Sequence, residues 1–178
     1  LTSTSQVLKF ECGLDHFFAD QVKLHQNLTN TTLLIKCDLE GIEHIGIAVR
    51  SIDKANAIFS QLLGTEHYKI EIVESEGVRT SFFKLGGVKL EFLQATSEDS
   101  PIAKFIEKRG EGVHHLAFQV PDLAQSMADC KKKGFQLINE TPKQGADNKM
   151  ICFLHPNTTA GILVELCADS EAISSSSH

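Results

Sequence analysis

The chain has 178 residues, of which 42% are hydrophobic, and a formal net charge of −6. This length and composition suit one globular domain with a buried core, or two small fused modules. The negative charge and the lack of a basic run argue against nucleic acid as a partner. No apolar stretch approaches the roughly 20 residues that a membrane-spanning helix needs, so we expect no membrane partner.

Five cysteines are scattered along the chain, and none of them forms a CxxC pair. This spacing predicts neither a zinc knuckle nor a disulfide framework. We expect buried thiols in a reducing compartment. Because the sequence also shows no recognisable secretory signal, it predicts a cytoplasmic protein.

The two ends of the chain differ from its middle. Residues 1–40 contain a polar Asn/Thr cluster and no Arg, which argues against a transit peptide. We interpret them as an N-terminal extension whose role the sequence does not reveal. Residues 169–178 are rich in Ser, and this low complexity predicts a disordered tail.

The first half of the middle region alternates between strand and helix patterns. We expect one strand, one helix and three strands, over 43–49, 51–64, 68–74, 78–85 and 88–95. Asp53 is the expected cap of the helix, and Gly64 is its expected end. Gly86 and Gly87 predict a hairpin turn between the last two strands.

The same order then begins again. A connecting helix is expected over 100–110, closed by Gly110. A strand, a helix and three strands follow, over 112–120, 122–134, 135–140, 149–155 and 161–167. The sequence therefore predicts an α+β domain over 41–168, made of two βαβββ repeats at about 41–97 and 112–168.

The first strand of each repeat carries one histidine at a matching position. Strand alternation places large apolar residues on one face and small residues with one histidine on the other. The two histidines are His44 and His115. His114 falls on the apolar face of the second strand, which favours His115 over its neighbour as the functional residue.

The last strand of each repeat carries a glutamate between two hydrophobic residues, Glu91 in the first and Glu165 in the second. A buried carboxylate is costly unless another group compensates its charge. For either glutamate alone, an amphipathic strand with the carboxylate in water is the simpler interpretation. Two histidines and two glutamates that obey one repeat instead predict a metal site at a pseudo-twofold axis.

The motifs HIGIAV, LEFLQ, HHLAFQV and VELC together resemble the vicinal oxygen chelate (glyoxalase-like) superfamily. Within it, DSPIAKFIEKRGEGVHHLAFQV and FLHPNTTAGILVEL are similar to methylmalonyl-CoA epimerases. This resemblance extends over about 41–168. It implies a glyoxalase-like domain with a metal cleft between the repeats.

The resemblance also implies a ligand set and a reaction. The implied metal ligands are His44, Glu91, His115 and Glu165. One divalent ion is expected, Co²⁺ first, with Mn²⁺, Zn²⁺ or Ni²⁺ as alternatives. The implied reaction is epimerisation at C2 of methylmalonyl-CoA through a metal-stabilised enolate, with Glu165 and Glu91 as acid and base. The resemblance further implies a homodimer.

Two positions depart from the epimerase pattern. Thr80 stands near the place where some members have a further acid–base carboxylate, and the usual GAHGK-like loop is GADNK at 145–149. An acyl-CoA substrate would also need cations for its phosphates. The available cations are Lys104, Lys108, Arg109, Lys143 and Lys149.

Three other functions are compatible with parts of this pattern. A lactoylglutathione lyase of the glyoxalase I type would use the same ligands and the same enolate chemistry. An extradiol dioxygenase uses two His and one Glu with iron, and the fourth acidic ligand disfavours it. A non-enzymatic protein that binds a small molecule would not need both His/Glu pairs.

Overall fold

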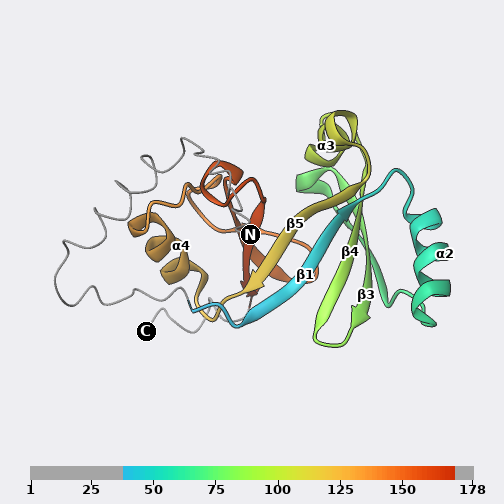
Figure 1. Ribbon diagram of the computed structural model, residues 1–178, viewed down its shortest axis with the longest axis horizontal. Coiled ribbons are helices and arrows are strands. Elements are labelled where there is room, and N and C mark those ends of the chain that lie inside the picture. The colour runs from blue at the N-terminus through green and yellow to red at the C-terminus, as the bar shows by residue number, and fades with distance from the viewer. Residues whose placement is uncertain (1–37, 171–178) are drawn as a thin grey trace, which may run out of the picture. The chain divides into compact units, whose positions relative to one another are not determined.

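The computed structural model describes residues 38–170 (Figure 1). The predicted extension over 1–40 and the predicted tail over 169–178 therefore lie almost entirely outside the described residues. The described part contains the predicted βαβββ order twice, so the prediction of an α+β fold with an internal repeat is confirmed.

The elements of the first repeat are β1 (Gly41–Ala48), α2 (Ile52–Leu63), β2 (Lys69–Val73), β3 (Val78–Leu85) and β4 (Val88–Ala95), with a 3-10 turn, η1 (Glu74–Glu76), after β2. Helix α3 (Pro101–Arg109) connects the two repeats. The second repeat consists of β5 (Gly112–Gln119), α4 (Leu123–Lys132), β6 (Lys143–Gln144), β7 (Lys149–Leu154), η2 (Pro156–Thr158) and β8 (Val164–Asp169).

The eight strands form one mixed sheet in the order β2-β3-β4-β1-β5-β8-β7-β6. This order reads the same from both ends when each strand is matched to its counterpart in the other repeat. Strands β1 and β5 pair antiparallel at the centre, and each pairs parallel with the last strand of its own repeat. Figure 1 shows β1 and β5 side by side, with α2 and α4 at opposite ends of the view.

The sheet is strongly curved. Strands β2 and β6 are at opposite edges of the sheet, yet side chains near these two edges contact each other. Lys69 of β2 lies 3.2 Å from Asp147, which precedes β7, and Glu76 of η1 lies 2.7 Å from Lys143 of β6. The curvature gives the sheet a concave face, and residues of both repeats line a cavity on it.

Each repeat builds its own hydrophobic core on the convex side, under its helix. In the first repeat, Ile52 of α2 packs with Phe83 and Phe92, and all three are fully buried. In the second, Leu123 of α4 packs with Leu166. Burial of each of these side chains stabilises the fold by about 1.5–3 kcal/mol. Since α2 and α4 cover the convex face, the concave face remains available for a site.

Two sequence predictions at the level of elements are wrong. Asp53 does not cap α2, because the helix begins at Ile52; the Ser51 side chain accepts the hydrogen bond from Lys54 N, and Asp53 instead pairs with Arg79. The strand expected over 135–140 is absent from the described residues. That segment forms one isolated bridge, Leu137 to Leu154, because the Asn139 side chain takes the next backbone N–H of β7.

Gly46 of β1 lies opposite His115 of β5, and a Cβ added there would lie 2.2 Å from Cε1 of the His115 ring. We expect Gly46→Ala to displace this ring and to lower the free energy of unfolding by about 1–3 kcal/mol. Denaturant unfolding and the metal content of the purified protein would measure both effects. Gly87→Ala is the matched control, because nothing lies within 4 Å of a Cβ there. Wild-type behaviour of Gly46→Ala would contradict the tight packing of this pair.

Candidate metal centre

The concave face of the sheet encloses a cavity of about 210 Å³. Most of its wall is apolar, with Leu93, Ile102, Ile151 and Phe153 among the lining residues. Polar side chains gather where the central strands pass beneath it. The cavity is smaller than the roughly 300–1,000 Å³ typical of sites for drug-sized ligands, so it suits a small acyl group.

The four predicted ligands come from the four central strands: His44 from β1, Glu91 from β4, His115 from β5 and Glu165 from β8. None of these residues is more than 7% exposed. The strand register explains why they meet, since Gly46 of β1 pairs with both Glu91 and His115. The interpretation of either glutamate as solvent-facing is therefore wrong.

Nitrogen and oxygen atoms of these four side chains approach one another around the two histidines. His44 Nε2 lies 2.9 Å from His115 Nε2, 3.2 Å from Glu91 Oε2 and 3.7 Å from Glu165 Oε1. His115 Nε2 lies 3.7 Å from Glu91 Oε2 and 3.6 Å from Glu165 Oε2. The structure thus brings together all four residues that the repeat predicted.

These separations fit a transition-metal ion. Two ligand atoms about 2.1 Å from one ion lie roughly 3.0 Å apart at a right angle and farther apart at wider angles. The separations that involve His44 or His115 run from 2.9 Å to 3.7 Å, and one atom each of His44, His115 and Glu165 lie within 4.8 Å of one another. Two imidazole nitrogens and two carboxylates are also a donor set suited to Co²⁺, Mn²⁺, Zn²⁺ or Ni²⁺.

Burial and mutual charge perturb the acid–base behaviour of the cluster. Burial raises the pKa of Glu165 to about 8. Burial alone would lower the pKa of His44, but the charge of Glu91 and the hydrogen bond to Glu43 outweigh it and raise that pKa to about 10. Burial and the neighbouring His44 hold the pKa of His115 well below its usual value.

Two further side chains join the site through irregularities of the central strand pair. Between β1 and β5, Ile42 pairs with Phe118 and His44 with Ala117, so Glu43 is an extra residue in β1. A β-bulge of this kind redirects a side chain. Glu43 therefore lines the cavity beside His44, although strand alternation would place it on the other face.

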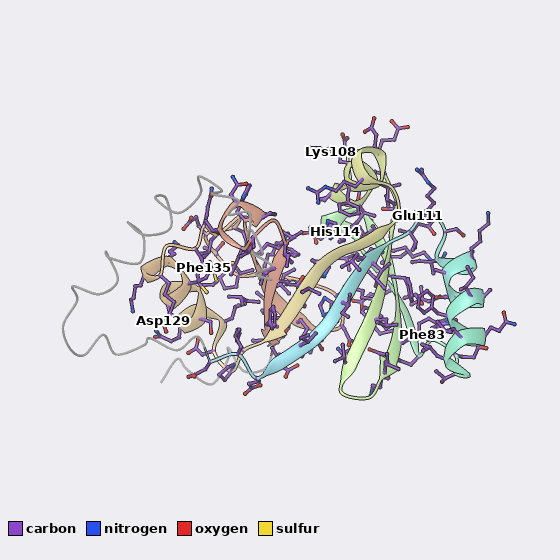
Figure 2. All side chains as sticks on the ribbon, viewed as in Figure 1. Phe83, Lys108, Glu111, His114, Asp129 and Phe135 are labelled. Atoms are coloured by element: carbon purple, nitrogen blue, oxygen red, sulfur yellow. The ribbon has the colours of Figure 1, made fainter. Side chains whose placement is uncertain are left out.

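The second irregularity is the counterpart of the first. Gly46 pairs with His115 and Ile47 with Val113, so His114 is an extra residue in β5. His114 lines the cavity next to His115, so the prediction that it lies on the apolar face is wrong. Figure 2 labels His114 on β5. The alternating pattern carries no sign of either bulge; the only available signal was a polar residue directly before each histidine.

A chain of charged side chains leads from His44 to the loop before β7. The Glu43 carboxylate contacts His44 Nδ1 at 2.5 Å and also pairs with Lys89. Lys89 in turn lies 2.6 Å from Asp147 Oδ2. Glu43, His44 and Cys167 also bring possible metal-binding atoms within 4.8 Å of one another. Because Lys89 already neutralises Glu43, these three residues are the weaker candidate for a metal site.

The remaining predicted residues lie around the cavity. Thr80 is buried in its wall and donates to the Glu71 carbonyl oxygen at 3.4 Å. Lys143 and Lys149 line it as well, but they are ion-paired with Glu76 and with Asp169. Within residues 38–170, no ion pair involves the cations of α3, which are Lys104, Lys108 and Arg109.

Known proteins are similar to this chain in sequence. A Bacillus subtilis protein described as uncharacterised is 42% identical over 126 residues, which cover 71% of this chain and 90% of that protein. Human mitochondrial methylmalonyl-CoA epimerase is 36% identical over 130 residues, which cover 72% of this chain and 74% of the human protein.

A solved structure is similar to this chain in fold as well as in sequence. Streptomyces coelicolor methylmalonyl-CoA epimerase, in a variant bound to 2-nitronate-propionyl-CoA, superposes with a TM-score of 0.72 at 36% identity. The match covers 74% of this chain and 99% of the Streptomyces chain. The pattern of the glyoxalase/bleomycin resistance protein/dioxygenase superfamily matches residues 43–153. By sequence, fold and strand order, this chain belongs to the glyoxalase/bleomycin resistance protein/dioxygenase superfamily.

Proposed function

We propose that this protein is a metal-dependent methylmalonyl-CoA epimerase. The observation that carries the proposal is the convergence of His44, Glu91, His115 and Glu165 beneath a cavity of acyl-group size. The similarity to the human and Streptomyces epimerases supports the choice of substrate.

The metal ligands in this proposal are two histidines and two glutamates: His44, Glu91, His115 and Glu165. A divalent ion held there would act as a Lewis acid on the thioester carbonyl oxygen and favour loss of the neighbouring C2 proton. Co²⁺ is the first choice from the family resemblance, with Mn²⁺, Zn²⁺ and Ni²⁺ as alternatives.

Epimerisation at C2 needs a proton to leave one face of the carbon and another to arrive on the opposite face. Glu165 is the first acid–base group in this proposal, because its buried carboxylate lines the cavity beside both ligand histidines. Glu91, or a water beside it, serves the other face. Thr80 lies in the cavity wall but has no carboxylate, so it cannot be the second acid–base group. Glu91 takes that role in this proposal.

The cavity accommodates the acyl group but not the nucleotide, so the nucleotide of the acyl-CoA must lie outside it. Helix α3 borders the cavity through Pro101 and Ile102, and its cations are exposed. Figure 2 shows Lys108 on this helix. Since Lys143 and Lys149 have acidic partners, α3 is the better source of positive charge for the CoA phosphates.

The alternative enzyme is a lactoylglutathione lyase, which needs the same ligands. An assay with its hemithioacetal substrate would separate the two activities, since an epimerase gives no lactoylglutathione. A non-enzymatic binding protein would give neither product. The fourth ligand, Glu91, continues to disfavour an iron dioxygenase.

Homodimer formation and a cytoplasmic location remain predictions. Among residues 38–170, no helix is long and apolar enough to cross a membrane. Light scattering of the purified protein would test the dimer.

Replacement of Glu165 by Gln tests the acid–base role. We expect Glu165→Gln to fold and to slow exchange of the C2 proton of methylmalonyl-CoA in heavy water by about 10²–10⁴-fold. Proton NMR measures this exchange directly. Glu107→Gln, at an exposed position of α3, is the matched control. Wild-type exchange in Glu165→Gln would exclude Glu165 as an acid–base group.

Metal affinity should depend on pH. Without an ion, Glu165 and His44 retain protons at neutral pH, because their pKa values are raised to about 8 and about 10. Metal binding must displace these protons, so affinity should rise as the pH increases from about 6 to about 8. Calorimetry in buffers of different ionisation enthalpy would count the released protons. Binding without proton release would contradict this assignment of charge.

The α3 cations should affect substrate binding more than turnover. We expect Lys104→Gln combined with Lys108→Gln to raise KM for the acyl-CoA about fivefold, equivalent to about 1 kcal/mol, with little change in kcat. Lys54→Gln, on the exposed side of α2, is the control. An unchanged KM would move the phosphate contacts to another surface.

A further inference from the structure

The two bulges place one polar side chain behind each ligand histidine. Glu43 Oε2 lies 2.5 Å from His44 Nδ1, and His114 Nδ1 lies 2.9 Å from His115 Nδ1. In both cases the contacted nitrogen is Nδ1, while Nε2 faces the other ligands of the cluster. The repeat therefore duplicates the arrangement of a ligand and its supporting group, as well as the ligand itself.

The two supporting groups differ in charge. Glu43 is a carboxylate, and it pairs with Lys89 as well as contacting His44. His114 is an imidazole, and its ring packs edge-on against Phe105 and contacts His115. A hydrogen bond to a charged acceptor is roughly twice as strong as one between neutral groups.

Glu43 is itself held in place from both repeats. One of its oxygens contacts His44, and the other pairs with Lys89 of β4 and with Lys149 of β7, the latter at 3.6 Å. Its side chain is only 9% exposed. A carboxylate fixed in this way can accept the Nδ1 hydrogen of His44 without itself turning toward solvent.

We propose that Glu43 is a positioning residue that holds His44 in the tautomer and ring orientation needed for metal binding, and that His114 supports His115 more weakly. The proposal rests on the metal site of the proposed function. With its hydrogen on Nδ1, His44 presents the Nε2 lone pair to the cluster. Carboxylates that accept the second N–H of a ligand histidine commonly change metal affinity by 10–100-fold.

The first test is the metal affinity of Glu43→Gln, measured with Zn²⁺ against a competing chelator. We expect Kd to increase about 10–100-fold in the folded variant. His114→Phe should increase it less, because a neutral partner is lost. Glu140→Gln is the control, since Glu140 is exposed and pairs with Lys131 away from the cavity.

A spectroscopic measurement separates positioning from a general loss of stability. In the Zn²⁺ form, nitrogen NMR of the imidazole rings should show a hydrogen-bonded proton on Nδ1 of His44, which Glu43→Gln should weaken or abolish. The corresponding signal of His115 should remain unchanged. An unaltered His44 signal and an unaltered Kd would overturn the proposal.

The outcomes also separate this proposal from the proposed function. Wild-type protein that binds no divalent ion would contradict the metal site itself. If wild-type protein and Glu43→Gln bind the metal equally tightly, only the role of Glu43 is contradicted. If Glu43→Gln does not fold, Glu43→Asp is measured instead. This variant keeps the negative charge but has a side chain one carbon shorter, so its carboxylate no longer reaches His44. Its Kd for Zn²⁺ must then increase about tenfold or more.

Discussion

The antiparallel pairing of β1 with β5 is the constraint on which the rest of this structure depends. Each repeat has its own helix and core, but each supplies only one His and one Glu of the four candidate ligands. The pairing sets Gly46 against His115 and thereby brings the two half-sites within hydrogen-bond distance. A slip of one residue in this register would turn one set of side chains to the opposite face.

The same pairing concentrates ionisable groups where water is scarce. Buried polar groups are costly unless they have partners, and a buried charge costs more. Around the cavity, the cost is reduced by pairing, as between Glu43 and Lys89 or between Lys143 and Glu76. The four central residues contact one another, and their two histidines also contact Glu43 and His114. Such a cluster of buried ionisable groups with shifted pKa values is typical of a functional site rather than of a stabilising network.

The internal repeat is symmetric in its backbone and unequal in its chemistry. Strand order and the position of the bulges obey the pseudo-twofold relation. The groups behind the two histidines do not, because one is Glu43 and the other His114. The wall above the site is also unequal, since Thr80 lies in the first repeat and the apolar Ile151 and Phe153 in the second.

The sequence by itself determined the repeat, the strand–helix order and the four central residues, because each depends on local periodicity and on motifs that recur along the chain. His44 and Glu165 were identifiable in this way despite their distance in sequence. Only the tertiary structure decided which further groups meet them. The bulges at Glu43 and His114 exist only in the pairing of β1 with β5, and the Lys69–Asp147 contact exists only because the sheet curves. Both arise from long-range backbone geometry, which the side-chain pattern of a single strand does not encode.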